Sequence, residues 1–188
     1  MNLNLNKLEK KINIKFKNIK LLTKSLTHKS YDSINNNEKL EFLGDRVLGL
    51  IISKKLLEIY PADQEGVLDK KLASLVNKKR CFEVAKSLGL EKFIFVGNTR
   101  KKIIKIENKI VSDCCEALIG AIYLDQGLNI VQKFILKTWK VHIKASAVTF
   151  IDSKTKLQEY SLKKFKILPI YKLLENSGPK HKPIFKVG

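Results

Sequence analysis

Over residues 5–142 the sequence repeats one pattern, in which segments of helical length carry apolar residues three and four positions apart. Short breaks separate these segments, and we expect Pro61 to end one helix and Gly127 to cap another. After Ala145 the sequence pattern predicts one further helix and two strands joined by a Gly-Pro loop. The sequence therefore predicts a mainly α protein, with an all-helical domain over residues 1–146 and the first part of an α+β domain over residues 152–188.

The charge of the chain favours a polyanionic partner. Its 188 residues include 37 basic and 18 acidic side chains, a formal net charge of +19. The alternative is a compositional skew, because only three of the basic residues are Arg while Lys, Asn and Ile are plentiful. Three cysteines without metal-ligand spacing indicate reduced thiols in a cytoplasmic protein. No apolar run reaches the length of about 18 residues that a membrane span needs, so we expect no membrane contact.

One predicted helix, residues 35–60, carries a stripe of carboxylates. A helix advances about 100° per residue, which places Glu38, Glu41 and Asp45 within a narrow sector. The same sector continues through Gly49 and then becomes apolar. A solvated acidic face would normally stay polar along its length. The stripe is therefore expected to face another part of the protein.

A second predicted helix repeats the design. Asp113 and Glu116 are three positions apart, and Gly120 follows one turn later. Glycine inside a helix costs about 1 kcal/mol relative to alanine, and close approach of a neighbouring helix is one reason to keep it. Such an approach, at Gly49 and Gly120, would bring the two acidic stripes face to face.

The five carboxylates, gathered at one partly buried site, would repel one another unless cations neutralised them. Hard oxygen ligands suit Mg²⁺ or Mn²⁺, and no His–Cys pattern indicates zinc. The alternative is that each acid is a separate surface charge or complements a helix dipole.

Three segments carry a family resemblance. "NEKLEFLGDRVL" (37–48) closely resembles the signature of the ribonuclease III family, and "LLTKSLTHKSY" (21–31) and "SDCCEALIGAIYLDQG" (112–127) resemble its opening helix and its second acidic segment. The resemblance implies an endoribonuclease that cuts double-stranded RNA to 5′-phosphate and 3′-hydroxyl ends. It also implies a homodimer that processes ribosomal RNA precursors and other structured transcripts.

The resemblance also implies roles for individual acids. Glu41, Asp113 and Glu116 would hold Mg²⁺, with Mn²⁺ able to substitute, and Asp45 and Glu116 would be most directly tied to the chemistry. Glu38 would be an accessory acid near the metal or the RNA.

The C-terminal segment resembles the first part of a double-stranded-RNA-binding domain, a shape-reading module that spans about 16 base pairs. By that resemblance Gln158 and Glu159 would contact sugar hydroxyls, and His181 would enter the minor groove. The family's domain continues through a third strand and a second helix, which this sequence does not reach before Gly188. We expect any resulting weakness to affect RNA affinity rather than the chemistry.

Two departures from the family pattern leave alternatives open. Arg46 stands where the family usually has a small residue, and it either contacts phosphate or forms a surface pair. The segment 97–113 is unusually basic and either lies near the RNA path or is a solvated face. A non-catalytic RNA-binding dimer of the same fold is the alternative function, but retention of all five acids disfavours it. A basic helical scaffold with no site would have no use for paired acidic stripes.

Overall fold

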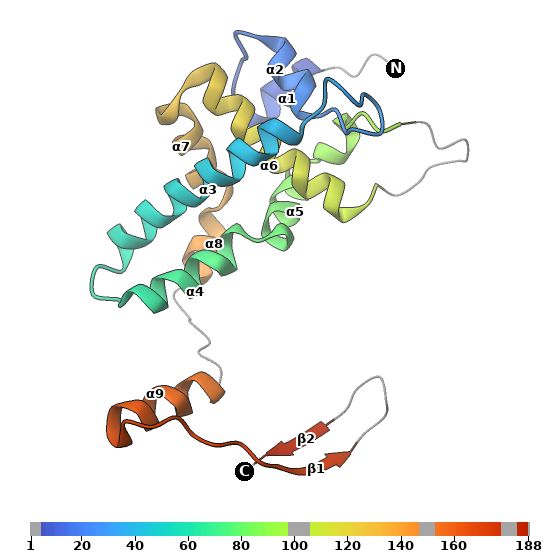
Figure 1. Ribbon diagram of the computed structural model, residues 1–188. Helices are drawn as coiled ribbons and strands as arrows, with labels where there is room; N and C mark the ends of the chain where they lie inside the picture. The colour runs from blue at the N-terminus through green and yellow to red at the C-terminus, as the bar shows by residue number, and fades with distance from the viewer. Residues whose placement is uncertain (1–4, 98–105, 147–152, 178–183, 188) are drawn as a thin grey trace. The chain divides into compact units, whose positions relative to one another are not determined.

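The chain divides into two compact units, Met1–Thr149 and Phe150–Gly188, each of which is described by itself (Figure 1). The computed structural model describes residues 5–97, 106–146, 153–177 and 184–187.

Helices build the first unit, as the sequence pattern predicts. In chain order they are α1 (Leu5–Ile12), α2 (Ile19–Ser25), α3 (Glu38–Ile59), α4 (Glu65–Val76), α5 (Lys78–Ser87), the short 3₁₀ helix η1 (Leu90–Phe93), α6 (Asn108–Gln126), α7 (Leu128–Thr138) and α8 (Lys140–Ala145).

Helix α6 is the centre of this unit. Every residue from Val111 to Ile122 is buried, so the helix is covered on all sides. Figure 1 shows α6 crossing α3, with α5 and α7 close by. Because Asp113 and Glu116 fall inside this buried run, the core itself carries two carboxylates.

Local signals end the two long helices where the sequence predicts. Helix α3 stops at Ile59, and Tyr60, which precedes Pro61, leaves the helical conformation with φ −126° and ψ 59°. Helix α6 stops before Gly127, which has φ 78°, a left-handed value that favours glycine. The Gly127 N–H donates to the Tyr123 carbonyl at 2.9 Å and closes the last turn.

The second unit contains a helix followed by a two-stranded antiparallel sheet, as predicted. Helix α9 spans Ser153–Phe165, and strands β1 (Leu173–Ser177) and β2 (Ile184–Val187) pair with a register irregularity between residues 173 and 175. The Ser161 hydroxyl donates to the Ile167 carbonyl at 2.7 Å, which ties the chain leaving α9 back to the helix. Among the described residues of both units, no helix is long and apolar enough to cross a bilayer.

Candidate metal centre

The start of α3 is anchored to its surroundings by Asn37. The Asn37 N–H donates to the Thr27 carbonyl at 2.9 Å, and its side-chain amide donates to the Cys114 sulfur on α6 at 3.3 Å. Asn37 is 1% exposed, so these contacts are shielded from water. They hold the first turn of α3, which carries Glu38 and Glu41, against the acidic part of α6.

Two glycines let α3 and α6 approach until their backbones touch. A Cβ placed on Gly44 would lie 1.7 Å from the Glu116 carbonyl oxygen, and one placed on Gly120 would lie 2.3 Å from the Leu40 carbonyl oxygen. No side chain fits at either position. The close approach predicted at Gly120 is therefore present, but its counterpart on α3 is Gly44.

The expectation for Gly49 is wrong. A Cβ on Gly49 would meet nothing within 4 Å, so this glycine does not lie at the crossing. Gly44 lies about 140° from Gly49 around the α3 axis, on the other flank of the acidic stripe. The helical angles place the acidic stripe correctly, but they do not determine which side of it packs against α6.

The crossing brings three carboxylates together. One oxygen each from Glu41, Asp113 and Glu116 can be chosen so that all three lie within 4.8 Å of one another. Glu116 is 2% exposed and Asp113 is 8% exposed, while Glu41 is half-buried at the rim. We call these three residues the acidic cluster.

Lys78, the first residue of α5, inserts its ammonium among these acids. Its Nζ donates to Glu41 Oε1 at 2.8 Å, to Asp113 Oδ1 at 2.6 Å and to Glu116 Oε2 at 2.7 Å. Lys78 is not among the site residues predicted from the sequence. The signal available was slight: Asn77 is a good helix-capping residue, and its side-chain oxygen accepts the Arg80 N–H at 3.0 Å.

The electrostatics of the centre follow from this arrangement. Burial raises the pKa of the Glu116 carboxyl above its ordinary value, although the hydrogen bond and charge of Lys78 oppose the rise. Partial burial lowers the pKa of Lys78, but hydrogen bonds to Asp113, Glu116 and Glu41 outweigh it and leave that pKa raised. The lysine therefore stays charged, and its single positive charge leaves a formal net charge of −2 on the three carboxylates and the ammonium together.

The oxygens converge well enough to hold a divalent cation. Ligands on opposite sides of Mg²⁺ lie about 4.2 Å apart, twice the usual bond length, so oxygens already within 4.8 Å need only small rotations to bind one ion. The ammonium of Lys78 shows that a single cationic group can contact all three at once. Carboxylate-only ligands favour Mg²⁺ or Mn²⁺ over softer metals.

The other two predicted acids lie outside the acidic cluster. Glu38 accepts a hydrogen bond from Lys29 Nζ at 3.0 Å, and both side chains are exposed. The Asp45 carboxylate pairs with the neighbouring Arg46 guanidinium, although its charge is near enough to raise the pKa of Glu116 slightly. Of the two alternatives for Arg46, the surface pair is present.

The cysteines take no part as ligands in the acidic cluster. Cys81, Cys114 and Cys115 are free and buried. Burial raises the pKa of Cys114 to about 12, although the hydrogen bond from Asn37 opposes the rise. The thiol stays protonated and serves as packing beside the site.

The predicted RNA-binding residues belong to the second unit. Gln158 is half-buried and Glu159 is exposed on α9, whereas His181 lies outside the described residues. Of the basic segment, Arg100, Lys101, Lys102 and Lys105 also lie outside them, and Lys109 is exposed in the first turn of α6.

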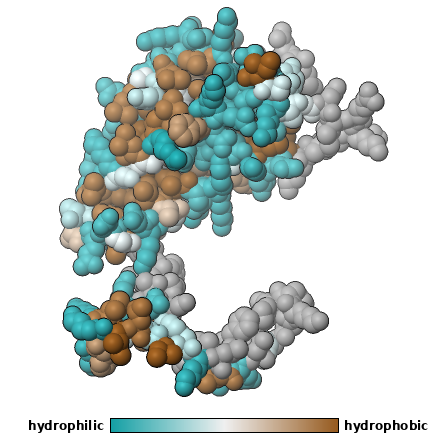
Figure 2. Space-filling view, viewed as in Figure 1, coloured by the Kyte–Doolittle hydropathy of each residue, from teal (hydrophilic) through white to brown (hydrophobic). Residues whose placement is uncertain are grey.

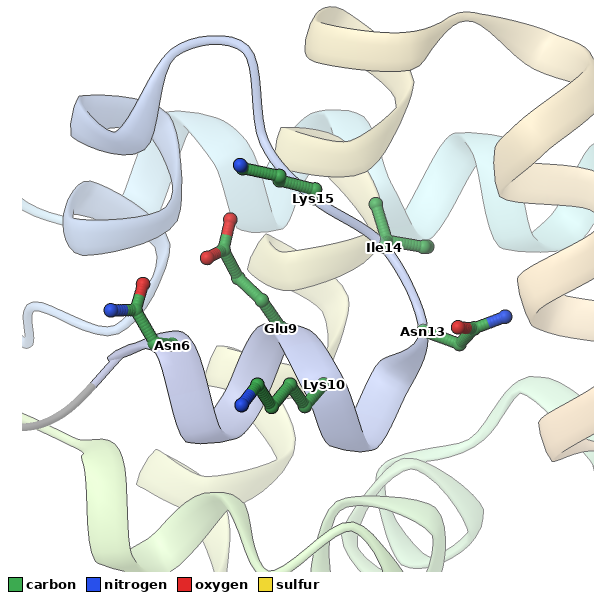
Figure 3. A pocket seen from close by; sticks show the side chains of 6 residues that line it. All are labelled: Asn6, Glu9, Lys10, Asn13, Ile14 and Lys15. Atoms are coloured by element: carbon green, nitrogen blue, oxygen red, sulfur yellow. The ribbon is translucent and has the colours of Figure 1, made fainter.

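A separate hollow of about 560 Å³ lies beside α1 (Figure 3). The Glu9 carboxylate accepts the Phe16 N–H at 2.8 Å, so it is already used in holding the chain that follows α1. Figure 3 shows the polar ends of Asn6, Glu9 and Lys15 on one side of the view, whereas Asn13 points the other way. The hollow is lined by Asn6, Glu9, Lys10, Asn13, Ile14 and Lys15.

A helical unit with a carboxylate cluster between two crossed helices favours a hydrolase that acts on nucleic acid over a plain binding module. The family model for Ribonuclease-III-like domains matches residues 18–142. The chain belongs to the ribonuclease III family.

Individual relatives agree over most of the chain. Ribonuclease 3 of Pelagibacter ubique is 69% identical over 182 residues, which cover 97% of this chain and 82% of the relative. Ribonuclease 3 of Nitratiruptor sp. is 41% identical over 190 residues, covering 98% and 83%.

Solved structures agree as well. A ribonuclease III nuclease domain from Campylobacter jejuni, noted for structural flexibility in a region involved in dimer formation, aligns with a TM-score of 0.67 and 36% identity. The alignment covers 74% of this chain and 98% of that one.

Proposed function

We propose that the chain is an endoribonuclease that hydrolyses phosphodiester bonds of double-stranded RNA at the acidic cluster, with Mg²⁺ as its cofactor. The observation that carries the proposal is the convergence of three buried or half-buried carboxylates in a chain of net charge +19. A protein that only bound RNA would gain nothing from burying negative charge in its core.

The acids have two proposed roles: some would bind the metal ion, and one would contact the attacking water. Glu41, Asp113 and Glu116 would hold Mg²⁺, and Mn²⁺, which prefers the same oxygen ligands, would substitute. When bound, the ion stabilises charge on the phosphate and lowers the pKa of a water. Asp45, whose side chain is 37% exposed, would accept a hydrogen bond from the attacking water.

The remaining polar groups position the reactants. Burial restricts the Glu116 carboxylate, which would keep it close to the position that the ion needs. Glu38 lies at the exposed start of α3, where it serves as an accessory acid near the RNA. In-line attack with departure of the ribose 3′ oxygen leaves a 5′-phosphate and a 3′-hydroxyl. Ribosomal RNA precursors and other structured transcripts are the substrates we propose.

We also propose a homodimer through the outer face of α3. Phe42, Leu50 and Leu57 are 67%, 61% and 58% exposed, and their spacing places them within a sector of about 80°. Figure 2 shows hydrophobic side chains gathered over this side of the first unit. An exposed apolar stripe of this kind is typical of a surface that a second copy covers. The Campylobacter jejuni nuclease domain, whose dimer-forming region is described, supports the assignment.

The dimer has a direct test. Leu50→Asp should convert the protein to a monomer in light scattering coupled to size exclusion, because a carboxylate cannot be buried there without a partner. Val141→Asp is the matched control, since Val141 is 74% exposed on α8 and should leave the mass unchanged. A dimer that survives Leu50→Asp would place the interface elsewhere.

The second unit would add affinity for the duplex. Gln158 and Glu159 lie on α9 and would contact ribose hydroxyls, and His181 would enter the minor groove. The free cysteines fit a cytoplasmic protein.

Duplex cleavage tests the enzyme. A labelled duplex of about 30 base pairs, longer than one RNA-binding domain spans, is incubated with wild type, Glu116→Gln and the exposed control Glu91→Gln. Each protein is assayed with Mg²⁺ and with chelator. We expect cutting with 5′-phosphate ends by the wild type and Glu91→Gln, and only with Mg²⁺. Binding without cutting by the wild type would favour the non-catalytic dimer instead.

A further inference from the structure

We propose that Lys78 is a positioning residue of the metal centre: its ammonium holds the three acids of the cluster together in the metal-free protein, and a divalent ion must displace it to bind. The inference rests on the proposed function, because it concerns the same centre.

The contacts of Lys78 converge on the place a metal would take. Its Nζ lies 2.6 to 2.8 Å from one oxygen of each of the three acids. A metal ion bonds such oxygens at about 2.0–2.2 Å, so an ion bound to the same three atoms would overlap the ammonium. The lysine and the ion therefore exclude each other from this position.

The lysine keeps the acids convergent while no ion is present. Glu41 comes from α3, whereas Asp113 and Glu116 come from α6, and three like charges this close would otherwise repel one another. One positive charge bonded to all three offsets part of that repulsion. Lys78 thus stabilises both the crossing of the two helices and a ligand geometry close to the one an ion needs.

The Lys78 side chain can also move out of the acidic cluster into solvent. Lys78 is half-exposed, with a side-chain exposure of 50%, although its ammonium touches buried acids. Its stem therefore lies along the surface, and a change of rotamer takes the ammonium into water without any backbone movement. Helix α5 keeps other anchors when the lysine leaves, because Cys81, Val84 and Ala85 are buried and Asn77 caps the helix through the Arg80 N–H. Release also returns the rotamer entropy lost in the bound state.

Competition of this kind has a measurable consequence. When the state able to bind an ion is only partly populated, the apparent dissociation constant rises by the inverse of that fraction. Removal of Lys78 should therefore tighten metal binding, which is the reverse of what loss of a merely structural residue would do. It should at the same time destabilise the metal-free protein.

The experiment measures Mn²⁺ binding without RNA. Free Mn²⁺ is followed by electron paramagnetic resonance during titration of wild type, Lys78→Met, Lys78→Arg and the control Lys79→Met, whose lysine is exposed one position away. We expect Lys78→Met to bind Mn²⁺ about tenfold more tightly, equivalent to about 1.4 kcal/mol. Lys78→Arg, which retains a cation within reach, and Lys79→Met should bind as the wild type does.

Thermal unfolding supplies the second measurement. Metal-free Lys78→Met should melt below the wild type, and Mn²⁺ should raise its Tm by more than it raises that of the wild type. Equal or weaker Mn²⁺ binding by Lys78→Met would overturn the inference and leave the proposed function standing. So would tightened binding in Lys78→Arg as large as in Lys78→Met. If Glu116→Gln binds Mn²⁺ as well as the wild type, the centre itself is wrong and both proposals fall.

Discussion

Substitution of Gly44 by alanine should damage both the fold and the metal centre. The added Cβ would lie 1.7 Å from the Glu116 carbonyl oxygen, 2.6 Å from its carbon and 2.9 Å from the Gly120 nitrogen. All three obstacles are backbone atoms, so no side chain can rotate to make room. Ordinary van der Waals contact begins at 3.4 Å, which means that the two helices must separate by about 1.7 Å at this point.

The magnitude follows from two opposing effects. Alanine favours a helix over glycine by about 1 kcal/mol. Overpacking typically costs about 1–3 kcal/mol, and obstruction by backbone belongs at or beyond the upper end of that range. We therefore expect a net loss of about 2 kcal/mol or more. For a protein of this size that corresponds to a fall in Tm of roughly 4–8 °C.

Gly49→Ala is the matched control, because it makes the same change in the same helix with nothing within 4 Å of the new Cβ. It should raise Tm by roughly 2–4 °C, since only the gain in helix propensity applies. Thermal unfolding by circular dichroism measures both variants, and Mn²⁺ titration should show weaker binding in Gly44→Ala alone. Equal Tm values for the two variants would refute the close crossing of α3 and α6.

Three further changes test separate parts of the structure. Trp139→Phe removes the indole N–H that donates to the Leu75 carbonyl at 2.9 Å, and the buried, unpaired carbonyl should cost about 1–3 kcal/mol in denaturant unfolding. An unchanged midpoint would show that water replaces the indole. Burial opposes ionisation of Asp125, but hydrogen bonds from the Lys17 and Asn18 N–H groups leave its pKa below the ordinary 3.8. The stability that ionised Asp125 contributes is present above the pKa it has in the unfolded chain, and it is lost as pH falls through its lower pKa in the folded protein. Asp125→Ala should therefore lower Tm at pH 7, and the Tm values of the variant and the wild type should converge below about pH 4. A constant difference in Tm would contradict the role of the charge. Mg²⁺ at 100 times its dissociation constant should add about 2.7 kcal/mol to stability, and chelator should remove this gain; no shift would argue against a metal centre.

The sequence predicts what depends on local periodicity. Helical spacing is a property of each segment, so the stripe containing Glu41 and the pair Asp113 and Glu116 are visible without the fold. The ends of α3 and α6 are equally local, because Pro61 and Gly127 act on their immediate neighbours. The family resemblance then supplies the pairing of the two stripes.

Contacts between helices could not be predicted in this way, because they depend on how the helices are placed relative to one another. Gly44 and Gly49 both lie near the acidic stripe, and only the position of α6 decides which of them is crowded. Lys78 is one of 37 basic residues, and nothing in its neighbours distinguishes it from Lys79. The direction of its reach depends on where α5 packs against α6. Asp45 shares the stripe, yet Arg46 engages its carboxylate outside the acidic cluster.

The charge of the metal-free centre explains why Lys78 can stabilise the acidic cluster but cannot prepare it to bind the phosphate of RNA. Three carboxylates and one ammonium leave two net negative charges, which repel the phosphate of an approaching RNA strand. Exchange of the ammonium for one Mg²⁺ leaves a single negative charge, and a second ion would make the centre positive. Lys78, once its ammonium is in solvent, adds a further positive charge beside the acidic cluster. A strongly basic chain can therefore carry a buried acidic centre without deterring its substrate, provided that divalent ions replace the lysine before the phosphate binds.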